Sequence, residues 1–430
     1  MSETNTIFAR ATAVGRAGVS IIRISGRDAL SVCEVFGRLA PCPARQAILH
    51  NFQYNGEFID SGLIIVFKGP HSFTGEDVVE FQLHGGVAII NRVIEILSSL
   101  SYFRMAKPGE FSQRAFLNEK MDLVEAEGLV DLINAETKSQ QQQASRLMQG
   151  HASKFFIELR QRILEAMALL EAYIDFPDEE IPLEVSQQVK ATIEALRGDI
   201  EYQLGAGQSA ERLREGFNII LLGSPNSGKS TLLNALVKRE AAIVSDIAGT
   251  TRDIIEVNSE VHGIPVTFID TAGLRESNDI IEKQGIERAL EKAEQADIIL
   301  QLVDSKEMPV SIENDAIIVA TKSDGINAPD FNYDYLISAK RGDGVEEMLD
   351  GIASYLEVRV PKEDCFALHQ RHCQLLAQAN ENLRNFQEGG VVEIQAEHLR
   401  LAASSLSDII GHHTVDDLLD IVFSSFCIGK

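Results

Sequence analysis

A glycine-rich turn that follows an apolar run constrains the fold of this chain most strongly. The run FNIILLG ends at residue 223, and the turn continues as GSPNSGKS over residues 223–230. It fits the pattern G-x-x-x-x-G-K-[ST], which binds phosphate when it lies between a buried strand and the start of a helix. Backbone N–H groups surround the phosphates, the lysine reaches their outer oxygens and the hydroxyl binds Mg²⁺. We therefore predict these two roles for Lys229 and Ser230.

The surrounding residues predict an α/β domain. Strand-like apolar runs recur at 266–270, 298–303, 316–320 and 335–338, and segments with helical spacing separate them. This alternation is typical of a parallel sheet built from βαβ units. We expect the domain to cover residues 216–361.

The flanking regions have other patterns. Residues 1–118 alternate short apolar runs with glycine-rich turns, which predicts an α+β domain. Residues 119–215 and 362–430 have apolar residues at three- and four-residue spacing, which indicates long amphipathic helices. We predict a multidomain chain in which the α/β P-loop domain is inserted into one all-α helical domain, after an α+β N-terminal domain.

Charge and composition narrow the class of protein. The chain has 430 residues, a net charge of −25 and five scattered cysteines without a Cys-x-x-Cys pair. We expect a cytoplasmic protein without a signal peptide or membrane span. The acidic excess either simply aids solubility or, if RNA is a partner, requires a local basic patch or a second protein to bind it. Residues 1–120 come close to balance, with 12 Lys and Arg against 11 Asp and Glu.

Two motifs predict the contacts to metal and γ-phosphate. The motif GTTRD at 249–253 supplies Thr251 for Mg²⁺ and the γ-phosphate, and DTAG at 270–273 ends a strand. Asp270 would hold Mg²⁺ through water, and the amide of Gly273 would contact the γ-phosphate.

Two later motifs predict selection of guanine. In TKSD, residues 321–324, Asp324 can accept from N1–H and the N2 amine of guanine, a pair that adenine lacks. In SAK, residues 338–340, a backbone amide would meet guanine O6. Thr321 stands where this pattern usually has asparagine, so we expect GTP selectivity to be retained and GTP affinity to be somewhat weaker.

In this order the motifs resemble the TrmE–Era–EngA class of GTPases, and longer stretches narrow the resemblance to the MnmE (TrmE) family of tRNA uridine-5-carboxymethylaminomethyl modification GTPases. The resemblance covers essentially the whole chain. The stretches that carry it are TIFARATAVGRAGVSIIRISG, FTGEDVVEFQLHGG, PGEFSQRAFLNEKMDLVEAEGLVDLI, IDFPDEEI, GSPNSGKSTLLNAL and the final CIGK.

The resemblance implies a GTP hydrolase that modifies C5 of the wobble uridine of certain tRNAs. It implies a homodimer formed through the N-terminal domain, and a larger complex with the FAD-dependent protein MnmG (GidA). The one-carbon unit would come from 5,10-methylenetetrahydrofolate, of which 5-formyltetrahydrofolate is an analogue. The family's folate positions match Arg23, Glu80, Lys120 and Lys430, and Cys427 could lie near this chemistry. From the residues alone, the four charged residues are more typical of ordinary surface charges, and Cys427 is at least as compatible with a free thiol.

The position after DTAG raises the question of which group orients the attacking water. Ras-like enzymes have glutamine there, whereas this chain has Leu274, and Arg252 and Arg275 are only candidates for an arginine finger. The resemblance implies K⁺ in place of the finger and Glu282 as the residue that orients water. The implied K⁺ ligands are Asn226, Ser245, Ile247 and Thr250.

Ser230 and Thr251 are the predicted Mg²⁺ ligands, and the predicted catalytic residues are Glu282, Lys229 and Thr251. The complete set predicted to bind GTP is Asn226, Ser227, Gly228, Lys229, Ser230, Thr231, Ser245, Asp246, Ile247, Ala248, Gly249, Thr250, Thr251, Asp270, Thr271, Ala272, Gly273, Lys322, Asp324, Ser338, Ala339 and Lys340.

Two other functions stay open. An Era-type ribosome-assembly GTPase would need a basic RNA-binding module, which neither pattern nor charge supports. A folate-dependent one-carbon transferase with a regulatory G domain is disfavoured by the intact set of Lys229, Thr251 and Asp270.

Overall fold

The chain divides into two compact units, which are described separately. One unit comprises Met1–Val130 and Ser407–Lys430, and the other comprises Asp131–Leu406. The structure is a computed structural model. It describes residues 5–38, 40–174, 183–224, 226–237, 255–270, 296–307, 316–325, 329–360, 365–366, 368–386 and 391–412, together with 419, 422–424, 426 and 429.

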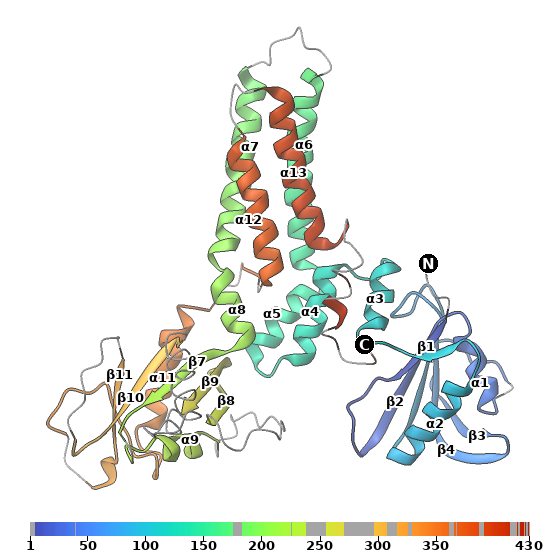
Figure 1. Ribbon diagram of the computed structural model, residues 1–430, viewed down its shortest axis with the longest axis horizontal. Helices are drawn as coiled ribbons and strands as arrows, with labels where there is room; N and C mark the ends of the chain where they lie inside the picture. Colours follow the sequence, from blue (N-terminus) through green and yellow to red (C-terminus); the bar gives the residue numbers. More distant parts are fainter. Residues whose placement is uncertain are drawn as a thin grey trace, which may run out of the picture. The chain divides into compact units, whose positions relative to one another are not determined.

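The first unit is built on a mixed six-stranded sheet of order β3-β4-β5-β2-β1-β6 (Figure 1). Neighbouring strands are antiparallel except for the parallel pair β1 and β6. The strands are β1 Thr6–Arg10, β2 Ala17–Ser25, β3 Ile48–Tyr54, β4 Glu57–Phe67, β5 Val78–Gly85 and β6 Phe103–Met105. The helical elements are η1 Ala29–Ser31, α1 Val32–Val35, α2 Val87–Ser99 and α3 Glu110–Leu117.

The core of this unit lies between the sheet and helix α2. Alternate residues of β4 are buried from Asp60 to Val66, as expected when one face of a strand packs inward. Ile90, Val93 and Leu97 of α2 are buried in the same apolar cluster as Ile64 and Phe81 of the sheet. The predicted α+β character of this region is confirmed.

The second unit contains a helical part. Its helices are α5 Lys138–Met148, α6 His151–Ile174, α7 Leu183–Gly205, α8 Gly207–Glu215, α12 Gln370–Asn385 and α13 Val392–Ile410, the last of which ends beyond Leu406. Helix α4, Leu123–Asn134, crosses the boundary between the units. Helix α7 packs against α6 and α12, which lie on opposite sides of the nucleotide module in the sequence (Figure 1). The helical region is therefore assembled from segments on both sides of an insertion.

The inserted module has a six-stranded sheet of order β12-β11-β10-β7-β9-β8. All neighbours are parallel except β8 and β9, which form an antiparallel hairpin. Its elements are β7 Phe217–Leu222, α9 Lys229–Val237, β8 Ile255–Val261, β9 Ile264–Asp270, β10 Ile298–Asp304, β11 Ile317–Thr321, η3 Ser323–Gly325, β12 Tyr335–Leu336 and α11 Val345–Glu357.

The connections of β7 fix where a ligand can bind. Strand β7 lies between β9 and β10, so the strand order reverses beside it. In open α/β sheets, ligands bind at the carboxyl ends of the strands at such a switch point. The P-loop leaves the carboxyl end of β7 and enters α9, which is the predicted context. Strand β8 is an element that the sequence analysis missed. The exact domain boundaries 118, 215 and 361 stay a prediction.

Candidate functional site

The phosphate-binding loop has a backbone conformation that most residues other than glycine could adopt only with strain or a steric clash. Gly223 has φ +155°, and a Cβ there would lie 2.3 Å from the carbonyl oxygen of Leu302. Gly228 has φ +103° and Asn226 has φ 67°. Asparagine tolerates this left-handed region better than most residues. The pattern of glycines in the sequence thus reflects a tight turn against strand β10.

Lys229 is held inside this loop. Lys229 is only 6% exposed. Its Nζ donates to the carbonyl oxygens of Gly223 (2.6 Å) and Ser224 (3.0 Å). Burial lowers the pKa of Lys229, and the carboxylate of Asp270 acts in the opposite direction. The ammonium therefore lies within the loop on two backbone carbonyls, which phosphate oxygens would replace as its partners.

Ser230 and Asp270 bring two oxygen donors together. The hydroxyl of Ser230 donates to Oδ2 of Asp270 at 3.2 Å, although the residues are 40 positions apart. Asp270 closes strand β9 and is 2% exposed. A hydroxyl and a carboxylate from neighbouring elements suit Mg²⁺, which prefers oxygen ligands and keeps several waters.

A cavity of about 420 Å³ opens beside the loop. Its lining residues are Gly228, Thr231, Asp304, Lys306, Thr321, Lys322, Asp324, Ser338, Ala339 and Lys340. The predicted guanine residues of TKSD and SAK therefore lie around one cavity with the P-loop. Ser338 is buried, and its amide donates to the carbonyl of Asp343, which folds the SAK segment back on itself.

Thr321 connects the two halves of this site. Its hydroxyl lies 2.6 Å from the carbonyl oxygen of Ser227 in the P-loop and 3.2 Å from that of Val303 in β10. The residue is 2% exposed. Because a hydroxyl has a single hydrogen, these are two acceptors for one donor. Thr321 thus holds the TKSD segment against the P-loop.

Asp304 is a site residue that the sequence analysis missed. It ends β10, and its Oδ2 lies 2.6 Å from Nζ of Lys322, the lysine of the TKSD motif. The hydrogen bond from Lys322 lowers the pKa of Asp304 against a smaller opposing effect of burial. Its place at the carboxyl end of a parallel strand is the signal that could have identified it.

A second predicted cluster lies in the first unit. Arg23 of β2 and Glu80 of β5 are directly opposite in the antiparallel ladder, with 2.9 Å between Nε and Oε1. The guanidinium carbon of Arg23 is 5.3 Å from the ring centre of Phe73 and 5.8 Å from that of Phe111. Arg23 also donates to the carbonyl of Gly429 at 3.3 Å. The two aromatic rings were not anticipated from the sequence.

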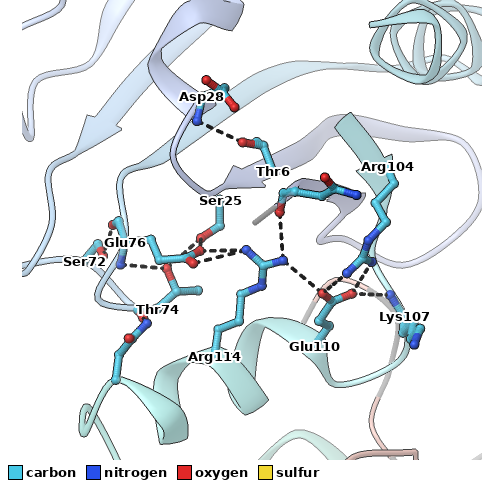
Figure 2. Close-up of polar contacts among 12 residues, drawn as sticks. Thr6, Ser25, Asp28, Ser72, Thr74, Glu76, Arg104, Lys107, Glu110 and Arg114 are labelled. Carbon is cyan, nitrogen blue, oxygen red and sulfur yellow. Dashed lines mark hydrogen bonds and ion pairs between the residues drawn. The ribbon is translucent and has the colours of Figure 1, made fainter. Parts of the chain in front are cut away.

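An ion-pair network fixes the loop that carries Phe73 (Figure 2). Glu76 of this loop accepts from Arg114 of α3 and from the hydroxyl of Ser25. Arg114 also pairs with Glu110, which in turn accepts two hydrogen bonds from Arg104 at 2.6 and 2.7 Å. Figure 2 shows these charges in one continuous chain between β6, α3 and the loop.

Lys120 lies at the edge of the same loop. A Cβ on Gly75 would lie 3.1 Å from Cε of Lys120. The structure brings Arg23 and Glu80 into contact, whereas it gives no contact of Lys120 with that pair.

Several predicted residues lie outside the described part of the chain. They are Ser245, Asp246, Ile247, Ala248, Gly249, Thr250, Thr251, Thr271, Ala272, Gly273, Glu282 and Lys430, as well as Leu274, Arg252, Arg275 and Cys427. Within the described residues, no helix combines the length and apolarity needed to cross a bilayer.

Comparisons with known proteins match nearly the whole chain. The family model "GTP-binding protein TrmE N-terminus" matches residues 6–120, and "MnmE helical domain" matches residues 123–427. The tRNA modification GTPase MnmE of Brucella canis is 43% identical over 99% of this chain and 98% of its own length. The protein of the same name from Roseobacter denitrificans is 43% identical over 99% of this chain and its full length. The crystal structure of Aquifex aeolicus Era is 24% identical over 40% of this chain and 68% of its own, with a TM-score of 0.27.

Proposed function

This chain belongs to the MnmE (TrmE) family, and on that premise we propose that it hydrolyses GTP as part of a tRNA modification reaction. The observation that carries the proposal is the convergence of Lys229, Ser230 and Asp270 beside a cavity lined by Asp324. The family matches extend over residues 6–120 and 123–427, well beyond the nucleotide module. This extent favours tRNA modification over the two alternative functions.

The chain's own residues divide the work of GTP binding. Lys229 would donate to phosphate oxygens, while Ser230 and Asp270 would hold the metal. When bound, Mg²⁺ offsets negative charge on the β- and γ-phosphates. Asp324 accepts from the guanine edge, and the pairing of Lys322 with Asp304 holds that lysine at the cavity wall.

Asn226 is the described residue on which the K⁺ proposal rests. The residue is exposed and has φ 67°, so its side chain is not packed into the core. An exposed amide on a phosphate-binding loop can turn its oxygen toward a cation, which favours a ligand role over a packing role. K⁺ would supply positive charge near the phosphates in place of an arginine finger. The proposal includes three further K⁺ ligands, Ser245, Ile247 and Thr250. It also includes Glu282 as the residue that orients the attacking water.

The first unit supports a folate proposal. Glu80 can accept hydrogen bonds from the donor edge of a pterin, and the guanidinium of Arg23 beside it can orient that carboxylate. The rings of Phe73 and Phe111 beside Arg23 offer flat apolar surface for an aromatic ligand. We include a homodimer, the FAD-dependent partner MnmG and a cytoplasmic location in the same proposal. The family resemblance supports all three, and the free thiols of Cys33, Cys42, Cys365 and Cys373 fit the reducing environment of the cytoplasm.

The K⁺ and Glu282 proposals are tested together by hydrolysis kinetics on the full chain. We expect faster GTP hydrolysis in KCl than in NaCl of equal ionic strength, and loss of this difference in Asn226→Ala. Glu282→Ala should bind GTP normally and hydrolyse it at least about a hundredfold more slowly. Glu287→Ala, on the same stretch of sequence, is the control. Equal rates in both salts would remove K⁺ from the account, and full turnover in Glu282→Ala would remove that residue.

A further inference from the structure

Two cysteines in the first unit lie close together and have no part in the proposed function. The Sγ atoms of Cys33 and Cys42 are 3.8 Å apart, and neither residue is in a disulfide. Cys33 lies in α1, and Cys42 lies in a segment that has no helix or strand from residue 40 to 43. Both side chains belong to, or pack against, the core cluster that includes Phe36 and Phe52.

The surroundings of the two thiols are unequal. Cys42 is only partly buried, and Nε of Arg38 lies 3.1 Å from its sulfur. A neighbouring guanidinium stabilises a thiolate, which is the nucleophilic form of cysteine. Cys33 is 6% exposed. Burial and the neighbouring Cys42 raise the pKa of Cys33 to about 12. One thiol is therefore partly exposed beside a cation, whereas its neighbour is buried.

The local backbone keeps the two cysteines near each other. A disulfide needs the sulfur atoms at about 2.05 Å, so the present separation must shorten. Cys33 lies in α1, in which Val32 and Cys33 are buried, while Gly37 at φ +89° turns the chain shortly after this helix. The amide of Arg38 donates to the carbonyl of Cys33 at 2.8 Å and keeps the returning segment close. The adjustment would fall on the irregular segment that carries Cys42.

We propose that Cys33 and Cys42 form a dithiol site that undergoes reversible thiol–disulfide exchange with low-molecular-weight disulfides such as glutathione disulfide. The Cys42 thiolate attacks one sulfur of glutathione disulfide and releases one glutathione thiolate. The Cys33 sulfur then displaces the second glutathione from Cys42, and the Cys33 proton passes to the departing glutathione thiolate. The protein dithiol is oxidised to a Cys33–Cys42 disulfide, and the small disulfide is reduced to two thiols. In a reducing compartment such a bond is transient.

The first experiment maps the products on the full chain. The reduced protein is incubated with glutathione disulfide, alkylated and digested, and the peptides are identified by mass spectrometry. We expect a Cys33–Cys42 cross-link that dithiothreitol reverses. Cys33→Ser should instead retain glutathione on Cys42, whereas Cys42→Ser should leave Cys33 unmodified. The proposal is overturned if Cys42 reacts no faster than Cys365 and Cys373, or if Cys33 reacts in the absence of Cys42.

A second experiment tests the role of Arg38 by kinetics. Arg38→Gln should slow modification of Cys42 by roughly three- to tenfold at neutral pH and shift the rate profile to higher pH, because the thiolate loses its cation. Arg45→Gln is a matched control on the same segment, where Arg45 contacts the carbonyl of His71 instead. Both variants should retain GTP hydrolysis and thermal stability. Equal rates in the two variants would contradict activation by Arg38.

Discussion

The hydroxyl of Thr321 lies 2.6 Å from the carbonyl oxygen of Ser227, so the TKSD segment, which we propose recognises guanine, is tied to the P-loop. Thr321, which stands where this motif usually has asparagine, therefore still couples the motif to the P-loop. It does so through a hydroxyl that donates to the carbonyl of Ser227. It does not supply a second donor, because a hydroxyl has only one hydrogen.

Thr321→Val should weaken GTP binding by roughly tenfold. The substitution keeps the shape of the side chain but leaves the buried carbonyl of Ser227 without this donor, at a cost of about 1–3 kcal/mol. Thr321→Ser retains the hydroxyl and is the control. Fluorescent GTP analogues measure the affinities. Equal affinity in the valine and serine variants would show that the hydrogen bond does not couple the two segments.

Asp324→Asn should change which base is bound. An amide cannot accept from both guanine N–H groups and places a donor where the carboxylate had an oxygen. GTP affinity should fall by about a hundredfold or more, and xanthosine triphosphate, which has a carbonyl at that position, should gain. Competition binding measures the ratio, with Asp330→Asn as a control outside the cavity-lining residues. Unchanged preference for GTP would contradict the assignment of Asp324.

Glu110→Gln should destabilise the first unit most strongly at neutral pH. Burial would raise the pKa of Glu110, but hydrogen bonds from Arg104 and the amide of Lys107 lower it below 4.5. A carboxyl with a depressed folded-state pKa stabilises the fold above its unfolded pKa, and this contribution is lost as pH falls through the folded value. We expect a loss of about 3 kcal/mol at pH 7.

The difference from wild type should narrow as the pH falls below 4.5, where Glu110 of the unfolded chain becomes protonated, and it should be lost below the lower pKa of the folded state. Thermal unfolding at several pH values measures it. Glu95→Gln is the control because Glu95 is in an exposed pair with Arg92. If the stability difference stayed constant with pH, the charge of Glu110 would not be what stabilises the fold.

How much of this could be foreseen depended on whether the signal was local. The P-loop was predicted because its glycines and the Lys229–Ser230 pair lie within one short stretch, residues 223–230, and together form one phosphate-binding turn. Strand β8 was missed because its run IEVNSEV mixes polar residues with apolar ones.

Contacts between distant residues were beyond sequence reasoning without an established register. Arg23 and Glu80 are 57 residues apart and meet only because β2 and β5 pair in one register. Their assignment to a common site came from the family resemblance. The Cys33–Cys42 contact follows from the path of an irregular segment, which no spacing rule describes.

Glu80→Gln should weaken binding of 5-formyltetrahydrofolate by about tenfold or more. A neutral amide is a poorer acceptor than a carboxylate for the donor edge of a pterin. Calorimetry on the full chain measures the affinity, and GTP affinity should be unchanged. Glu57→Gln is the control, since Glu57 pairs with Arg92 near the surface. Unaltered folate affinity in a folded Glu80→Gln protein would contradict this site.

The central claim is that GTP hydrolysis by this chain serves the modification of wobble uridine in tRNA. The most direct measurement is nucleoside analysis of tRNA from a deletion strain that carries the wild-type chain, Lys229→Ala or no chain. The account predicts that the carboxymethylaminomethyl group at uridine C5 disappears in the deletion and returns only with the wild-type chain. Unchanged wobble uridines in the deletion strain, or full restoration by Lys229→Ala, would contradict it.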